Sequence, residues 1–173
     1  MIISTLLADK TRKATVKREL IAQALRDGEI SVEDFSVLAG LDDKSQGIVL
    51  EAMEAVTNAQ PETADETWLA YAVRFIDSAA NNPKREASRV VGNIAHLFPD
   101  SLDAAVEKLL ANTEDSGTVI RWSSAYALGR IIRIQKYAAS GLFDILTAIC
   151  EKEKDNGIVT QYLNGLKKAQ KIR

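Results

Sequence analysis

Residues 119–131 read VIRWSSAYALGRI, and a related pattern recurs along the chain. The other copies are PKREASRVVGNI at 83–94, VTQYLNGL at 159–166 and VLEAMEAV at 49–56. Each copy contains a small residue, and these residues are Ala55, Gly92, Gly129 and Gly165, separated by 37, 37 and 36 residues. Because each copy is an apolar stretch with helical spacing, the pattern predicts a stack of like-shaped helical units.

The sequence predicts helix over almost the whole chain, and turn-forming residues separate one helix from the next. The breaks fall at Asp27-Gly28, Gly40, Asn81-Asn82, Asp115-Ser116-Gly117, Ser140-Gly141 and Asp155-Asn156-Gly157. They predict helices over 9–27, 31–40, 44–58, 65–79, 83–97, 101–113, 118–134, 139–153 and 157–171. Asn82 before Pro83 suits an N-cap followed by proline at the first helical position. No segment of useful length alternates apolar and polar residues, so no sheet is expected.

These helices pair naturally along the chain, and the second member of each pair is called here the B helix. We expect an all-α fold, an α-α superhelix forming a short right-handed solenoid of about four antiparallel helix pairs. The chain is then one domain over 1–173, with a capping helix in 1–28 and repeats at about 31–58, 65–97, 101–134 and 139–172.

The glycines of the repeat have a packing explanation. Each glycine inside a helix costs about 1 kcal/mol relative to alanine. Repeating that cost at Gly92, Gly129 and Gly165 indicates a close approach of the neighbouring helix, where a side chain would collide.

The segment 119–129 resembles the second helix of the HEAT repeat, within the armadillo-type helical-repeat class. That helix commonly shows a valine-arginine pair, two small residues and an alanine-leucine-glycine run, as in Val119/Ile120-Arg121, Ser124-Ala125 and Ala127-Leu128-Gly129. Residues 83–92 resemble it more loosely, 157–171 keep only the glycine, and 44–58 match least. The resemblance implies a scaffold or binding module, which is an expectation by analogy.

Composition narrows the function classes. The formal net charge is −2, from 22 Lys and Arg against 24 Asp and Glu, so there is no global basic excess of the kind typical of phosphate binding. The single cysteine, Cys150, excludes an intrachain disulfide and is expected to be a buried thiol in a reducing compartment. No apolar run is long enough for a membrane span, and the N-terminus does not have the character of a signal peptide. A cytoplasmic protein without membrane contact is expected.

No catalytic or metal-binding constellation is recognisable in the sequence. His96 is the only histidine, and its place near a helix end suits contact with the last carbonyls. One histidine and one cysteine do not make a zinc site. Phosphate-binding glycine loops and nucleophile elbows are absent. We therefore expect no enzyme activity, metal or cofactor.

The best candidate site is a stripe along two neighbouring B helices. Spacings of three and four share one helical face. Counted from the repeat glycine, the stripe at −7, −3, +1 and +4 includes Arg85, Arg89, Asn93, Trp122, Tyr126, Arg130 and Arg133. Arginine with tryptophan and tyrosine is typical of binding hot spots, and B helices usually line the concave face of such solenoids.

Two alternatives for this stripe stay open. Its long side chains suit an ordinary solvated face, with Glu51, Glu54 or Glu86 pairing some charges. The stripe in the flanking repeats is apolar, at Ile48, Ala52, Val56, Ile158, Tyr162 and Leu166. Those residues either wall a basic pocket or show that the end repeats pack differently.

Three functions follow from the sequence. The leading hypothesis is a non-catalytic module that binds a protein or peptide segment, acidic or extended, on a basic-aromatic concave face. The second is a DNA-binding protein resembling the HEAT-like DNA alkylation-repair glycosylases, although the stripe in 118–134 carries no carboxylate. The third is a structural subunit that joins copies of itself through its apolar end repeats.

Overall fold

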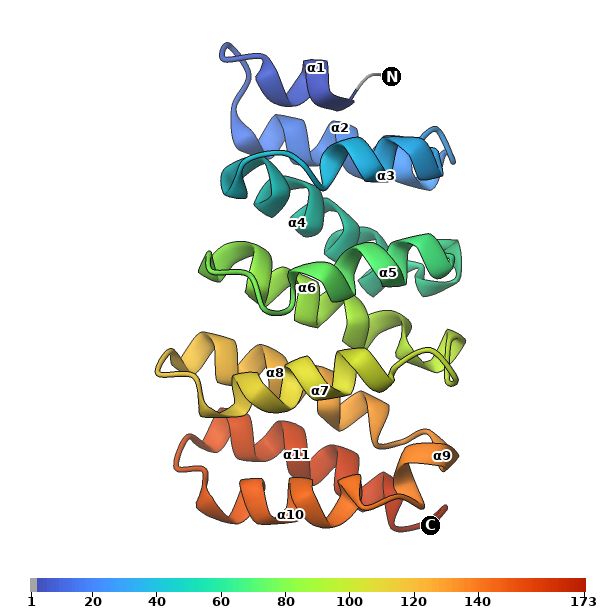
Figure 1. Cartoon of the computed structure of the whole chain (residues 1–173), viewed down its shortest axis with the longest axis vertical. Coiled ribbons are helices and arrows are strands. Elements are labelled where there is room, and N and C mark those ends of the chain that lie inside the picture. Colours follow the sequence, from blue (N-terminus) through green and yellow to red (C-terminus); the bar gives the residue numbers. More distant parts are fainter. Residues whose placement is uncertain (1–2) are drawn as a thin grey trace.

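The computed structural model describes residues 3–173, which form helices joined by turns and contain no strand. The expected all-helical solenoid is confirmed, with helix pairs stacked along the long axis and the two chain ends at opposite ends (Figure 1). None of these helices combines the length and apolar character of a membrane span. The helices are α1 (Ile3–Ala8), α2 (Ala14–Arg26), α3 (Val32–Leu38), α4 (Asp43–Ala59), α5 (Glu66–Phe75), α6 (Asn81–Ile94), α7 (Asp103–Ala111), α8 (Thr118–Ile131), α9 (Gln135–Ala138), α10 (Leu142–Lys152) and α11 (Asn156–Ala169).

Two columns of helices make up the stack. The B helices α2, α4, α6, α8 and α11 pack one against the next without interruption. The shorter helices α1, α3, α5, α7 and α10 precede them in the chain and cover one side of this column. Short 3₁₀ turns at Pro61–Thr63, Ala95–Leu97 and Asn112–Glu114 follow α4, α6 and α7.

The N-terminal segment differs from the prediction. Instead of one helix over 9–27, it forms α1 and α2, joined by a turn in which the Asp9 carboxylate accepts hydrogen bonds from Thr11 and Arg12. Lys17 of α2 donates to the Leu7 carbonyl oxygen at 2.5 Å. Since α2 packs on α4 as the other B helices pack on each other, this segment is a further helix pair.

Side-chain caps set where several helices begin. Ser31 and Asp34 form a reciprocal capping box at the start of α3, and Asp42 accepts from the Ser45 backbone at the start of α4. Asp65 and Asp155 cap α5 and α11 in the same manner. These side chains satisfy backbone N–H groups that have no partner within the helix.

The start of α6 departs from the expected cap. The helix begins at Asn81, and the Asn82 side chain is not its N-cap. Asn82 instead donates to Glu51 of α4 and accepts from Arg85. Pro83 is tolerated in this first turn because N–H groups there have no helical acceptor.

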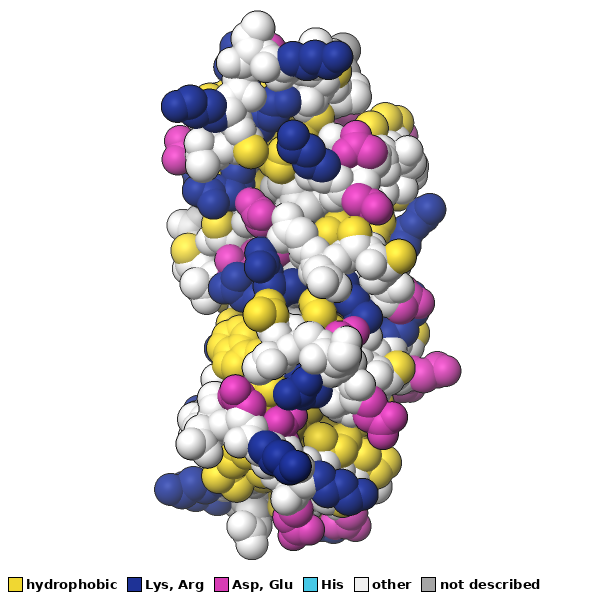
Figure 2. Space-filling model, turned by 90° about the vertical axis from the view of Figure 1, so that its left-hand side faces the viewer, with side chains coloured by type: hydrophobic (Ala, Val, Ile, Leu, Met, Phe, Trp, Pro, Cys, Tyr) yellow, Lys and Arg dark blue, Asp and Glu magenta, His cyan; other side chains and the backbone are white. Residues whose placement is uncertain are grey.

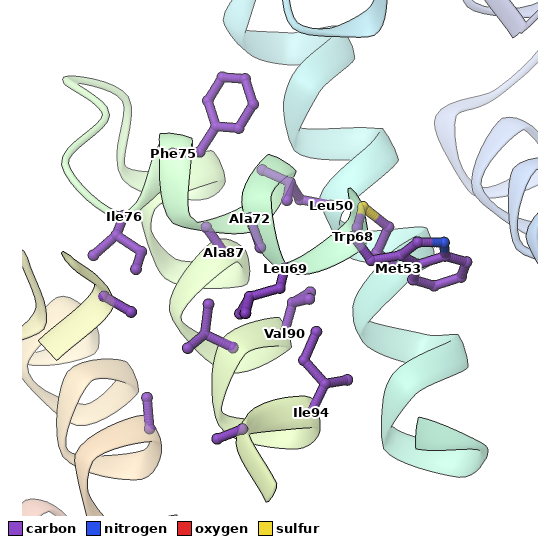
Figure 3. Packing of buried hydrophobic residues seen from close by; sticks show 14 of the residues in the cluster. Leu50, Met53, Trp68, Leu69, Ala72, Phe75, Ile76, Ala87, Val90 and Ile94 are labelled. Atoms are coloured by element: carbon purple, nitrogen blue, oxygen red, sulfur yellow. The ribbon is translucent and has the colours of Figure 1, made fainter. Parts of the chain in front are cut away.

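The core runs the length of the stack between the two columns. In its centre, Leu50 and Met53 of α4, Leu69 of α5, and Val90 and Ile94 of α6 interdigitate (Figure 3). All five side chains are almost wholly buried. Cys150 is also buried, as expected for a packed thiol.

The repeat glycines mark where B helices touch through their backbones. A Cβ at Gly129 would lie 2.5 Å from the Gln161 carbonyl oxygen of α11, and one at Gly165 would meet the backbone of Gly129. A Cβ at Gly92 would lie 3.0 Å from Ala127 Cα and from the Tyr126 ring. The packing explanation for these three glycines is therefore confirmed.

Ala55 was predicted to hold the position in α4 that Gly92, Gly129 and Gly165 hold in the later B helices, and that prediction is wrong. Ala55 is exposed, whereas the three glycines are buried. Tyr126, three residues before Gly129, bonds Asn93, one residue after Gly92. Arg89, three residues before Gly92, pairs in the same way with Glu54, one residue after Met53. Met53 thus holds the equivalent position in α4, and a spacing count of 37 missed it by two residues.

We expect Gly129→Ala to lower the free energy of unfolding by about 1–3 kcal/mol, because the new methyl group would force two backbones apart. The gain in helix propensity, about 1 kcal/mol, only partly offsets this. Urea denaturation measures the change. Gly141→Ala is the control, since a Cβ there meets nothing within 4 Å. Equal stability of the two variants would contradict the backbone-contact explanation.

Candidate functional site

The predicted stripe lies on one face of the B-helix column, which we call the B-helix face. Arg85 and Arg89 of α6 are partly exposed there, with 36% and 31% of their side chains accessible. Trp122, Arg130 and Arg133 are also partly exposed. The predicted residues are therefore brought together, but their surroundings differ between α6 and α8.

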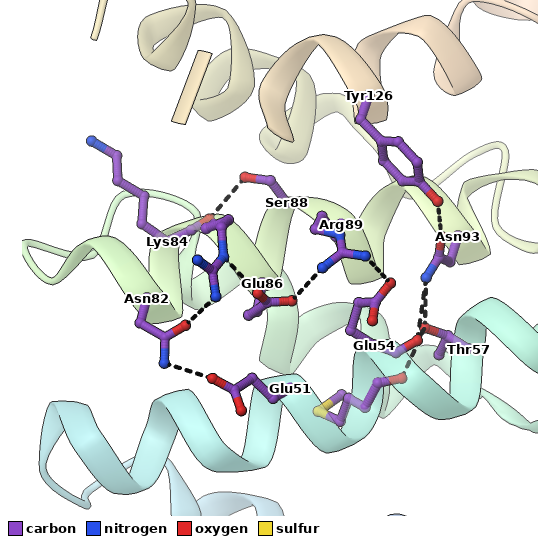
Figure 4. Close-up of polar contacts among 12 residues, drawn as sticks. Glu51, Glu54, Thr57, Asn82, Lys84, Glu86, Ser88, Arg89, Asn93 and Tyr126 are labelled. Atoms are coloured by element: carbon purple, nitrogen blue, oxygen red, sulfur yellow. Dashed lines mark hydrogen bonds and ion pairs between the residues drawn. The ribbon is translucent and has the colours of Figure 1, made fainter. Parts of the chain in front are cut away.

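The arginines of α6 are held by carboxylates of the same face (Figure 4). Arg85 Nε lies 2.6 Å from Glu86 Oε1, and Arg89 lies 2.7 Å from Glu54 and 3.2 Å from Glu86. Glu86 is only 2% exposed, so its charge requires these partners. The expected free basic surface is therefore wrong for α6, where the ion pairs considered as the alternative form.

Glu54 is a half-buried carboxyl group of this network. Burial raises its pKa above the ordinary value, the Arg89 guanidinium opposes that rise, and Glu86 adds to it. Both carboxylates are engaged by arginine, and neither is placed as a free general base.

Asn93 is a buried bridge and not a surface residue. Its amide nitrogen lies 3.1 Å from Thr57 Oγ1 of α4, and its oxygen accepts from the Tyr126 hydroxyl of α8 at 2.5 Å. Asn93 and Tyr126 are each only 8% exposed. Their prediction as partner-contacting residues is corrected here, since these polar groups face neighbouring helices (Figure 4).

Trp122, Tyr126 and Arg130 of α8 form an aromatic shelf, in which Trp122 and Arg130 are partly exposed and Tyr126 is buried in contact with both. The two rings stack with centroids 5.4 Å apart and an interplanar angle of 28°. The Arg130 guanidinium carbon lies 3.5 Å from the centroid of the Tyr126 ring, a cation–π geometry. Burial raises the pKa of Tyr126, which stays a neutral donor to Asn93.

Arg133 lies just beyond the end of α8. Its Nε donates to the Gly129 carbonyl oxygen at 2.8 Å, which fixes the side chain against the helix end. Burial and the nearby Arg130 charge lower its pKa. Arginine stays protonated despite such shifts, so two positive charges lie close together here.

A groove of about 480 Å³ lies between α2, α4 and α6, and we call it the N-terminal groove. Its charged lining consists of four arginines and four glutamates: Arg18, Arg26, Arg85, Arg89, Glu19, Glu51, Glu54 and Glu86. The sequence reasoning missed the arginines of α2 because it treated that helix as a cap. Arg18, Ala22 and Arg26 all line the groove, and their four-residue spacing, which puts them on one helical face, was the available signal.

The apolar residues of the flanking stripes do not wall a pocket. Ile48, Ala52 and Val56 in α4, and Ile158, Tyr162 and Leu166 in α11, are all buried. Of the two alternatives, different packing of the end repeats therefore holds: the register of α4 is shifted, and the stripe positions of α11 are packed inside the stack.

No metal site is evident in residues 3–173, where no three His, Cys, Asp or Glu side chains converge. His96 is exposed in the 3₁₀ turn after α6. The charged face in Figure 2 shows Lys and Arg side chains interspersed with Asp and Glu along the molecule.

The overall architecture has clear counterparts among solved structures. A designed armadillo repeat protein in complex with the peptide (KR)4 superposes with a TM-score of 0.70 at 15% identity, over 95% of this chain and 78% of that one. A computationally designed armadillo repeat protein for modular peptide recognition gives 0.64 at 15% identity, over 96% and 80%. An engineered protein gives 0.65 at 18% identity, over 98% and 78%.

The chain has an armadillo/HEAT-like helical-repeat fold. At these identities the likeness concerns the fold alone. No protein-family model matches the chain, and no curated protein is similar to it in sequence.

We expect Tyr126→Phe to lower the free energy of unfolding by about 1–2 kcal/mol, because it removes a buried donor and leaves the Asn93 oxygen without one. Chemical denaturation is the measurement. Tyr71→Phe is a matched control, since the buried Tyr71 hydroxyl has no hydrogen-bond partner within residues 3–173. That control should be neutral or slightly stabilising, and equal losses in both variants would refute a bridging role for Tyr126.

Proposed function

We propose that the chain is a non-catalytic binding module that holds a segment of another protein along its B-helix face. The observation that carries the proposal is the continuity of this face. Side chains from α2, α4, α6 and α8 meet at the N-terminal groove and the aromatic shelf, which are adjacent because Tyr126 bonds Asn93 beside the groove. A ligand spanning several repeats matches such a surface better than a small molecule.

The dimensions suit an extended segment. Packed helices lie about 8–10 Å apart, and an extended chain advances about 3.3–3.6 Å per residue. One B helix therefore corresponds to about three residues of a partner, and the whole column to about a dozen.

The aromatic shelf offers the strongest anchor on this face. Trp122 and Arg130 belong to the residue types enriched in interface hot spots. Their positions are pre-set by stacking on Tyr126, so less side-chain freedom is lost on binding.

The similar designed proteins support a binding role for this chain. One is described in complex with the peptide (KR)4, and another as made for modular peptide recognition. The engagement of Glu54 and Glu86 by arginine leaves neither free to act as a general base, which supports binding over catalysis.

Affinity purification from a native lysate, read out by mass spectrometry, tests the proposal. We expect the triple variant Arg18→Ala, Arg26→Ala, Arg130→Ala to lose partners that the wild-type chain retains. None of these three arginines forms an ion pair among residues 3–173, so the substitutions leave no buried charge unpaired.

A control variant also removes three positive charges, but from the column of shorter helices and the turns that follow them. It combines Arg74→Ala of α5, Lys152→Ala of α10 and Lys154→Ala of the following turn, all exposed residues. This control should recover the same proteins as the wild type. Identical recovery with both triple variants would show that the B-helix face is not the binding surface.

A further inference from the structure

A second groove, of about 360 Å³, lies at the C-terminal end of the stack. Arg133 at the end of α8 lines it, together with Asn164, Lys167 and Lys168 of α11 and Lys171 just beyond. We call it the C-terminal basic groove. No acidic side chain lines it, whereas the N-terminal groove has equal numbers of arginines and glutamates.

The four cations of this groove have no carboxylate partner. None of them takes part in an ion pair within residues 3–173. Arg85 and Arg89 of α6, in contrast, are both paired with glutamates. Lys167, Lys168 and Lys171 are exposed, and Arg133 is partly buried and fixed by its bond to Gly129. Arg130 of the aromatic shelf adds a fifth uncompensated charge nearby, since it lowers the pKa of Arg133.

Helix dipoles do not account for this concentration of charge. The C-terminal ends of α8 and α11 lie here, and each is equivalent to about half a negative charge. Together the two helix ends supply about one negative elementary charge, which neutralises only a small part of the five positive side-chain charges. The chain as a whole is slightly acidic, at −2, so the excess is local.

We propose that the C-terminal basic groove binds an acidic peptide segment of the protein partner. The proposal rests on the binding function given above and specifies the chemistry of one end of the partner. Carboxylates of such a segment complement the three lysines and Arg133, and the Asn164 amide offers a further hydrogen-bonding group.

A peptide fits this face better than a nucleic acid does. A polynucleotide carries negative charge along its whole length. Continued past α8, it would meet Glu51, Glu54 and Glu86 at the N-terminal groove. A peptide can be acidic at one end and mixed or neutral at the other, which matches the change in charge along the B-helix face.

Fluorescence anisotropy with three labelled probes tests the assignment. The probes are an (ED)4 peptide, a (KR)4 peptide and a single-stranded oligothymidine with eight phosphates. We expect the wild-type chain to bind (ED)4 more tightly than the other two at low salt. The affinity should fall as salt rises, because exposed charges are screened over about 8 Å at 0.15 M ionic strength.

The triple variant Lys167→Glu, Lys168→Glu, Lys171→Glu should bind (ED)4 at least about tenfold more weakly, since three attractive charges become repulsive. The control variant Lys10→Glu, Lys44→Glu, Lys152→Glu makes the same change in net charge at other exposed sites. It should retain most of the affinity. Circular dichroism checks that both variants fold.

Three results would overturn the acidic-peptide assignment: no (ED)4 binding by the wild type, equal weakening in both variants, or oligothymidine binding as tight as (ED)4. Failure of the wider proposal is a separate result. Suppose that the wild-type chain does not bind (ED)4, but the triple variant Arg18→Ala, Arg26→Ala, Arg130→Ala still loses native partners. Then only the assignment of the C-terminal basic groove is refuted. If native partners survive every variant, the binding face itself is refuted.

Discussion

The backbone contact between Gly129 of α8 and Gly165 of α11 sets the helix spacing on which the C-terminal half of the solenoid depends. A methyl group on either residue would overlap the opposite backbone. The same kind of approach at Gly92 places the Tyr126 ring directly against α6. Because the backbones are this close, side chains on the exposed face lie within hydrogen-bonding and ion-pairing distance of the next helix. The polar network of the B-helix face therefore depends on residues that have no side chain of their own.

Charge is distributed unevenly along that face, and the distribution explains how a slightly acidic protein can have a basic region. In the α4–α6 part, carboxylates on adjacent helices pair with Arg85 and Arg89, and little charge is left over. In the α8–α11 part, the acidic positions are absent and the cations stay solvated. Burial enforces the first arrangement, because a charge as buried as that of Glu86 is costly unless it is paired. Solvation permits the second, so only there is charge free to attract a partner.

The repeat pattern was enough to predict the architecture, since close-packed helices impose a small residue at a fixed period. It failed in α4, where Met53 and not Ala55 holds the equivalent position, because neighbouring repeats differ in length by two residues. The candidate-site residues lie together along the B-helix column, as their spacing predicted, but their exposure was not predictable. Asn93 of α6 and Tyr126 of α8 bond each other and are both buried. Such a contact depends on the distance between two helices, which residue spacing within one helix does not reveal. The lysines of α11 were missed because the stripe was counted through Ile158, Tyr162 and Leu166, which are buried, whereas the lysines lie at other positions of the helix.

Asn93 has a further consequence for how the solenoid opens. In a repeat protein each unit contacts only its neighbours, so terminal units can unfold singly while the rest stays intact. One amide here links α4, α6 and α8 through Thr57 and Tyr126, so releasing any of these helices breaks a buried side-chain hydrogen bond between helices. The three central pairs are thereby coupled by more than the apolar and backbone packing that all pairs share. We therefore expect thermal fraying to start at the two ends, with the middle of the B-helix face opening last.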